Sequence, residues 1–140
     1  MPTSASVATA ETIVIDASVV VTLLIDPGDI GNAIGARLEH ADLIAPMHLP
    51  VEVTNVLRRR RNAALLAPTE ATLGRDGLAE LPLELWPWET VADRVWQLGN
   101  SLSSYDAAYV ALAEQTGSPL LTRDKRIAGA PGVTCAVELS

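Results

Sequence analysis

Short apolar runs alternate with longer helix-like stretches along the sequence, and this alternation constrains the fold more than any other feature. Five runs have the apolar, often β-branched composition of buried strands: residues 12–15, 43–45, 83–86, 119–122 and 133–137. Apolar residues recur at helical spacing between them, over residues 17–25, 30–39, 50–61, 91–98 and 105–115 and from Pro68 onward. We therefore expect an α/β domain with a mostly parallel sheet of four to five strands and helices on both faces.

The chain of 140 residues is about one domain long, and it contains no recognisable linker or internal repeat. We expect residues 1–11 to form a flexible leader and residues 12–140 to form the folded domain. The leader lacks the basic start and apolar segment of a signal peptide, and no apolar run approaches the length of a membrane span. A single cysteine, Cys135, excludes an intramolecular disulfide. These features predict a cytoplasmic protein that does not contact a membrane.

Four acidic residues stand where predicted strands end or where the following helices begin. Asp16 and Asp124 come just beyond two strands, whereas Glu52 and Asp106 lie in the first turns of two helices. Ligands of open α/β sheets bind beside the carboxyl ends of the strands, so the four acids can share one cleft. Each acid can equally be a helix cap or a first-turn acid stabilised by the helix dipole. Position alone leaves both interpretations open.

The segments that contain these acids resemble, in the same order, segments of the PIN-domain ribonucleases. They read IVIDAS (13–18), LPVEVTNVL (49–57), YDAAYVALAE (105–114) and LLTRDKR (120–126). Within that family the sequence is similar to the VapC branch, the toxins of toxin–antitoxin pairs, over about residues 12–137. The stretch between Arg61 and Leu83 matches no diagnostic segment, so the sequence does not indicate substrate specificity.

The resemblance implies a PIN-like, flavodoxin-like fold and a Mg²⁺- or Mn²⁺-dependent endoribonuclease. Carried over position by position, it implies four catalytic and metal-binding acids and two supporting hydroxyl groups: Asp16, Glu52, Asp106 and Asp124, with Ser18 and Thr122. It further implies an RNA substrate, a small antitoxin that covers the cleft, a homodimer and a toxin–antitoxin hetero-oligomer. Any specific DNA binding would then belong to the antitoxin.

The charge of the chain agrees with metal-dependent chemistry. Seventeen acidic and ten basic residues give a net charge of −7, which disfavours a general nucleic-acid binder. Four close carboxylates repel one another, and hard divalent cations, which prefer oxygen ligands, relieve that repulsion. A metal-activated water can then attack a phosphodiester. We expect Asp16 and Asp106 to hold the principal ion, while Glu52 and Asp124 complete the site, position water or help hold a second ion.

Basic residues form two groups that can meet RNA. Three of them flank the last of the four acids and are the better placed: Arg123, Lys125 and Arg126. The second group, Arg58 to Arg61, spans just over one helical turn, so its side chains point in several directions. Three interpretations of this run stay open: a solvated helix end, an RNA-contacting rim, or an anchor for acidic residues of a partner.

Several other side chains favour structural interpretations. His48 is too isolated from other ligands for a metal site, and we expect it in a surface or loop position. Glu114 lies two turns beyond Asp106, and we expect it to face solvent. Tyr105 is expected to pack in the core, with base stacking as the alternative.

Two other functions fit part of the pattern. A phosphoacceptor receiver-type regulatory domain shares the flavodoxin-like sheet, but it requires adjacent acids after the first strand, where Ala17 and Ser18 follow Asp16. A PIN-domain nuclease that acts in RNA maturation, or on DNA, would carry the same acids. Measuring the cleavage of RNA and of DNA distinguishes a ribonuclease from a nuclease that acts on DNA.

Overall fold

The computed structural model describes residues 9–140 and contains a five-stranded, entirely parallel sheet. The elements, in chain order, are β1 (Thr12–Ile15), α1 (Ala17–Ile25), α2 (Asp29–Leu38), β2 (Asp42–Pro46), α3 (Leu49–Asn62), α4 (Pro68–Glu80), β3 (Leu83–Trp86), the 3-10 turn η1 (Trp88–Thr90), α5 (Ala92–Gln97), α6 (Ser104–Thr116), β4 (Leu120–Thr122), α7 (Lys125–Ala128) and β5 (Val137–Leu139). The strand order is β3-β2-β1-β4-β5. The predicted α/β fold is thereby confirmed.

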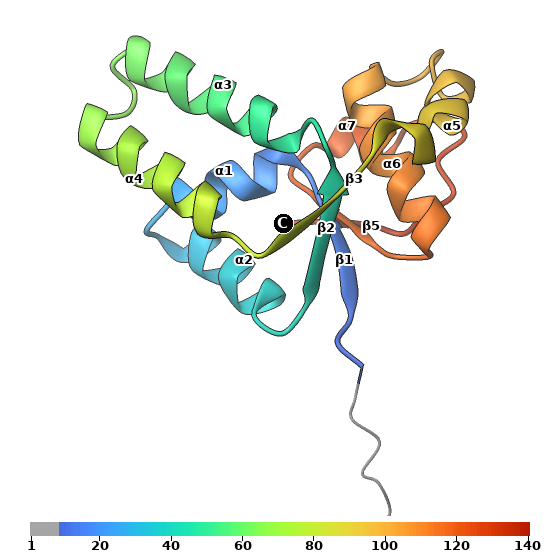
Figure 1. Ribbon diagram of the computed structural model, residues 1–140, viewed down its shortest axis with the longest axis horizontal. Coiled ribbons are helices and arrows are strands. Elements are labelled where there is room, and N and C mark those ends of the chain that lie inside the picture. Colours follow the sequence, from blue (N-terminus) through green and yellow to red (C-terminus); the bar gives the residue numbers. More distant parts are fainter. Residues whose placement is uncertain (1–8) are drawn as a thin grey trace, which may run out of the picture.

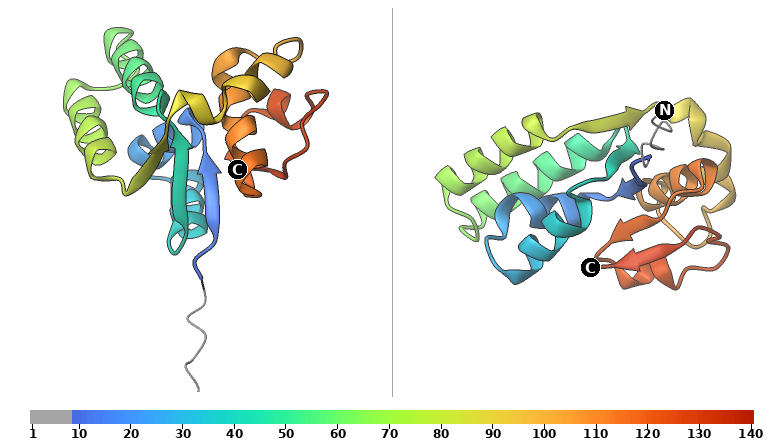
Figure 2. Two further views of the ribbon diagram at one scale, coloured as in Figure 1. Left: turned by 45° about the vertical axis from the view of Figure 1, so that its right-hand side comes forward. Right: turned by 90° about the horizontal axis from the view of Figure 1, so that it is seen from below.

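The helices cover both faces of the sheet, and the strand order explains how they divide. Helices α1 to α4 lie on one side and α5 to α7 on the other (Figures 1 and 2). The chain moves from β1 through β2 to β3 in one direction, and then from β4 to β5 in the other. Right-handed crossovers in opposite directions place their helices on opposite faces. The reversal falls between β1 and β4, and a crevice opens outside the carboxyl ends of strands at such a point.

Strand β1 and helix α6 form the centre of the core. Ile13, Val14 and Ile15 are all fully buried, because the strand has neighbours on both edges and helices on both faces. Helix α6 is buried continuously from Ala107 to Ala113 and contacts both β1 and β2. Its capping is well defined, with Ser103 at the N-terminus and Gly117 at the C-terminus in the left-handed conformation.

Helix α1 is apolar around most of its circumference because other elements surround it. It contacts α2, α3, α4 and β4. Among residues 9–140, no single helix has the length and apolar composition needed to cross a membrane; only α1 and α2 taken together do, and a bend of 117° separates them. The apolar character of α1 is thus accounted for by its packing within the domain.

The last strand lies further along the chain than the sequence predicts. A strand was expected over residues 133–137, but β5 covers Val137–Leu139, where it pairs with β4. Thr134 donates its backbone N–H and its hydroxyl to the Glu114 carboxylate, at 2.9 and 2.6 Å. These bonds direct residue 134 toward α6 instead of toward the sheet edge, so pairing starts only afterwards.

The proposed leader falls mostly on residues 1–8, which lie outside the described part of the chain. Glu11 is described, and its backbone oxygen accepts a hydrogen bond from the Asp42 N–H at 2.8 Å. Its carboxylate also pairs with Arg37 at 2.6 Å, and the same guanidinium binds Glu138 at 2.8 Å. Arg37 therefore connects the start of β1 with the edge strand β5.

Candidate active site

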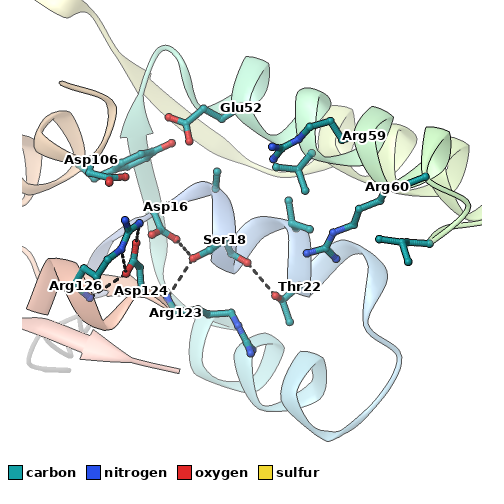
Figure 3. A pocket seen from close by; sticks show the side chains of 16 residues that line it. Asp16, Ser18, Thr22, Glu52, Arg59, Arg60, Asp106, Arg123, Asp124 and Arg126 are labelled. Carbon is teal, nitrogen blue, oxygen red and sulfur yellow. Dashed lines mark hydrogen bonds and ion pairs between the residues drawn. The ribbon is translucent and has the colours of Figure 1, made fainter. Parts of the chain in front are cut away.

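The four acids singled out in the sequence line a single cavity of about 650 Å³ at the carboxyl edge of the sheet (Figure 3). Asp16 follows β1 and Asp124 follows β4, the two strands that flank the reversal of strand order. Glu52 and Asp106 come from the first turns of α3 and α6. Side chains that are up to 108 positions apart in the sequence, from Asp16 to Asp124, thus face the same space.

Asp16 is held more firmly than the other acids. It caps the N-terminus of α1, where its Oδ1 accepts the Val19 N–H at 3.1 Å and the Ser18 hydroxyl at 2.6 Å. Its Oδ2 accepts a hydrogen bond from the Thr122 hydroxyl. The residue is only 5 % exposed, and this burial raises the pKa of its carboxyl group despite the three hydrogen bonds. The hydrogen bonds therefore fix the orientation of the Asp16 carboxylate, while burial makes its negative charge unfavourable.

The two hydroxyl residues named in the sequence both contact Asp16 and also join the ends of β1 and β4. The Ser18 hydroxyl accepts the Arg123 N–H at 3.1 Å, and the Thr122 hydroxyl accepts the Asp124 N–H at 3.0 Å. Thr122 is fully buried. Each hydroxyl thus donates to the carboxylate and accepts from the loop after β4, which fixes that loop against the start of α1.

The acids are close enough to influence one another electrostatically. The pKa of Asp106 is raised, first by burial and then by the negative charges of Asp124 and Glu52. Burial likewise raises the pKa of the Tyr109 hydroxyl, and the charges of Glu52, Asp16 and Asp106 add to the rise. The cavity is therefore a region of concentrated negative charge, where a cation would be attracted.

Asp124 is the acid whose charge is already balanced. Two side-chain nitrogens of Arg126 donate hydrogen bonds to the Asp124 carboxylate, Nε at 3.1 Å and Nη2 at 2.6 Å. The Arg126 backbone N–H donates a third, at 2.9 Å. The Arg126 hydrogen bonds hold the pKa of Asp124 below its usual value. The Arg126 side chain is itself 83 % exposed, so the pair lies at the mouth of the cavity.

The donor set of the cavity is chemically suited to a hard divalent cation. Carboxylate and hydroxyl oxygens are the ligands that Mg²⁺ and Mn²⁺ prefer. In the part of the chain that the structure describes, no three His, Cys, Asp or Glu side chains are arranged to hold a metal ion. The acids repel one another, and Arg126 already occupies the Asp124 carboxylate. The residues fit a metal by chemistry, while the closed ligand set is not formed in this arrangement.

Three further residues lie beside the acids, although the sequence assigned none of them to the acidic site: His48 was expected only in a surface or loop position, and Arg59 and Arg60 belong to the run whose role stayed open. His48 Nε2 lies 2.8 Å from Glu52 Oε1, although the two atoms are not aligned for a hydrogen bond. Its ring also packs against Tyr109 at 5.0 Å between centroids. Arg59 and Arg60 line the cavity. Spacing contained a signal for all three, because His48 precedes Glu52 by four positions, and Arg59 and Arg60 follow it by seven and eight.

The remaining candidates are distributed unevenly around the cavity. Arg123 and Arg126 line it, whereas Lys125 is exposed and lies outside the lining. Tyr105 is 64 % exposed, so the expectation that it packs in the core is wrong. Glu114 does not face solvent as expected, because only 12 % of its side chain is exposed. It binds Arg94 and Thr134 instead, away from the cavity.

An open parallel sheet with a carboxylate-lined crevice at its strand-order reversal defines a class of α/β proteins that bind ligands at that edge. Residues 13–133 match the family described as PIN domain. The chain therefore belongs to the PIN domain family.

Sequence relatives narrow the comparison further. The chain is 35% identical over 127 residues to Ribonuclease VapC12 of Mycobacterium tuberculosis, which covers 91% of this chain and 98% of that protein. It is also 35% identical over 127 residues to Ribonuclease VapC1 of the same organism, covering 90% of this chain and 96% of that protein.

Solved structures agree in fold at lower sequence identity. The crystal structure of Mycobacterium tuberculosis VapC20, described as a Sarcin-Ricin loop cleaving toxin, aligns with a TM-score of 0.61 at 16% identity, covering 87% of this chain and 96% of that one. VapBC2 from Rickettsia felis, bound to a DNA fragment from its promoter, aligns with a TM-score of 0.67 at 11% identity, covering 92% and 98%.

Proposed function

We propose that this chain is a metal-dependent endoribonuclease that acts as the toxin of a toxin–antitoxin pair. The observation that carries the proposal is the meeting of Asp16, Glu52, Asp106 and Asp124 around one cavity of a PIN domain. The identity of 35% with two VapC ribonucleases over nearly their whole lengths supports the same activity. The substrate is RNA, and the bond broken is a phosphodiester.

Each acid has a distinct task in this proposal. Asp16 and Asp106, whose pKa values are raised by burial and which form no ion pair within the described residues, hold the principal ion. Glu52 and Asp124 complete the site, orient the attacking water or help hold a second ion. When bound, Mg²⁺ or Mn²⁺ lowers the pKa of water and neutralises charge that develops on phosphate oxygens. Ser18 and Thr122 keep the Asp16 carboxylate oriented, and Arg126, at the cavity mouth, is placed to meet a phosphate.

A small antitoxin protein is the proposed partner, and it would cover the cavity. The Rickettsia felis structure, which contains VapBC2 and promoter DNA, supports a partner-bound assembly for proteins of this fold. The acidic net charge of −7 agrees with leaving specific DNA binding to the antitoxin. A homodimer and a toxin–antitoxin hetero-oligomer in the cytoplasm complete the proposal.

Purified protein incubated with RNA tests the activity directly. Internal cleavage of single-stranded RNA is expected with Mg²⁺ or Mn²⁺, and none with EDTA, because without a metal ion the attacking water is not activated and the charge that develops on the phosphate oxygens is not neutralised. Single-stranded DNA of the same sequence is the control substrate and is expected to stay intact. Undiminished RNA cleavage in EDTA, or the absence of cleavage with either metal, would contradict the proposal.

Thr122→Val tests the positioning of Asp16. Valine keeps the shape but removes the hydroxyl that donates to Asp16 and accepts from the Asp124 N–H. We expect metal affinity and cleavage to fall by about 10–100-fold, and the free energy of unfolding to fall by about 1–2 kcal/mol because a polar N–H loses its partner. Titration calorimetry with Mg²⁺ and thermal melting measure the two effects. Thr72→Val, on the exposed face of α4, is the matched control.

A further inference from the structure

The cavity carries opposite charges at its two ends. The four carboxylates gather at one end, and the side chains of Arg59 and Arg60 extend into the other end from α3 (Figure 3). Glu52, Val56, Arg59, Arg60 and Ala63 all line the cavity, and their spacing places them on one face of the helix. One wall of the cavity thus passes from an acid that faces the reaction centre to a pair of guanidinium groups.

These guanidinium groups have no side-chain partner among the described residues, a feature that they share with Arg58, which lies outside the cavity. Arg37, Arg94 and Arg126 each bind a carboxylate of the protein. Within residues 9–140, Arg59 and Arg60 make no side-chain hydrogen bond or ion pair. Arg123 lines the same cavity, and its Nη1 is buried without a hydrogen-bond partner. Guanidinium groups that line a cavity without an acceptor from the protein can bind an anion that enters it.

The spacing along α3 fits a strand of phosphates better than a single anion. Glu52 and the arginine pair are seven and eight positions apart, which is about 11 Å along a helix axis. A stacked strand advances about 3.4 Å per nucleotide, so this distance covers about three nucleotides. A polymer with regularly spaced negative charges can reach both ends of the cavity at once.

We propose that Arg59, Arg60 and Arg123 form a subsite that binds an RNA phosphate about three nucleotides from the cleaved bond. The inference rests on the proposed function and assigns part of the Arg58–Arg61 run to the substrate. Arg58 lines a neighbouring depression with Tyr105, and Arg61 contacts Asn62 instead of the cavity. The side chains of the Arg58–Arg61 run therefore point to different surfaces, and only the middle two enter the cavity. The subsite that they help to form determines where the RNA lies relative to the acids.

A double substitution with a matched control tests the subsite. R59Q/R60Q removes two charges that line the cavity, and R61Q/R75Q removes two exposed charges that do not. Binding of a fluorescent single-stranded RNA is measured in EDTA, where no cleavage occurs, over a range of salt concentrations. R59Q/R60Q is expected to bind at least about tenfold more weakly, with the slope of log K against log salt smaller by about 0.7, the value for one phosphate contact on a single strand. The control is expected to stay within about twofold of wild type.

Cleavage kinetics distinguish this subsite from a general charge effect. With long RNA and Mg²⁺, R59Q/R60Q is expected to raise KM and leave kcat nearly unchanged, because the contact is made equally in the ground and transition states. With an RNA too short to reach from the acids to the arginines, the variant and wild type should have the same KM. Both double variants carry substitutions only at exposed positions, so their melting temperatures should agree with that of the wild type.

The outcomes separate the inference from the function on which it rests. If the wild type cleaves RNA and R59Q/R60Q binds RNA as the control does, the subsite is wrong and the ribonuclease assignment stands. Equal losses in both double variants would also overturn the subsite, because they would reflect net charge alone. If R59Q/R60Q loses affinity for an acidic partner protein but keeps that for RNA, the arginines serve the partner and the subsite is wrong. If the wild type neither binds nor cleaves RNA, both proposals fall.

Discussion

Asp16→Asn is expected to lower the rate of RNA cleavage by at least about a thousandfold while the protein stays folded. The substitution removes the negative charge proposed to hold the principal ion, and a thousandfold loss corresponds to about 4 kcal/mol of transition-state stabilisation. Asparagine is as good a helix N-cap as aspartate, and its oxygen can still accept from Val19 and Ser18. Cleavage of labelled RNA, with circular dichroism to verify the fold, measures the effect.

Metal-free stability should change in the opposite direction. Burial raises the pKa of Asp16, so at neutral pH its charge costs folding free energy that is regained as pH falls from the raised pKa toward 3.8. Asp16→Asn should therefore melt at a higher temperature than wild type in EDTA at neutral pH. Mg²⁺ should raise the melting temperature of wild type and leave the variant nearly unchanged. Asp76→Asn, on the exposed face of α4, is the control. Near wild-type cleavage by folded Asp16→Asn would contradict the proposal that Asp16 holds the principal metal ion.

Glu114→Ala is expected to produce the largest loss of stability, about 2–3 kcal/mol. The carboxylate binds Arg94 at 2.6 and 3.1 Å and also accepts the N–H and hydroxyl of Thr134. It thereby connects α6 to α5 and to the loop before β5. Its removal leaves a partly buried guanidinium and a loop N–H without an acceptor. Urea unfolding measures the loss, and Glu114→Gln, which keeps the shape, should lose less.

The Glu114 contribution should depend on pH in a defined direction. Hydrogen bonds to Arg94 and Thr134 hold its pKa below the usual 4.5. A carboxylate with a lowered pKa stabilises the fold above its unfolded-state pKa, and that stabilisation is lost as pH falls through the folded-state pKa. The stability difference between wild type and Glu114→Ala should thus be full at neutral pH and shrink below about pH 4.5. Glu80→Ala, at the exposed end of α4, should show little difference at any pH. A pH-independent difference would contradict the ionic role.

The sequence predicts the elements whose signals are local. Residues 12–15 form β1 as expected, because a β-branched run followed by an N-capping aspartate needs no distant partner to specify a strand and a helix start. The positions of the four acids at element ends likewise follow from local patterns. That they line one cavity follows from sheet topology, which alternating strands and helices already favour.

The features that the sequence does not predict depend on contacts between distant residues. The start of β5 depends on Thr134 meeting Glu114, 20 positions away, and no property of residues 133–136 indicates it. The same contact explains why Glu114 is buried. The directions of Arg58 to Arg61 depend on which side of α3 packs against the domain, and Val53 and Leu57 determine that side by being buried. Helical spacing counted from those two residues predicts which arginines of the run lie on the same face of α3.

The contact between Thr122 and Asp16 joins groups that are 106 positions apart in the chain. During translation, Asp16 leaves the ribosome long before β4 exists. A nascent chain at that stage lacks Asp124, and it also lacks the Thr122 hydroxyl that orients the Asp16 carboxylate. The proposed reaction centre can therefore be assembled only after Asp124 has been synthesised. Under the proposed function, copies that stop before β4 cannot cleave RNA, and the proposed antitoxin has to act only on copies that extend beyond it.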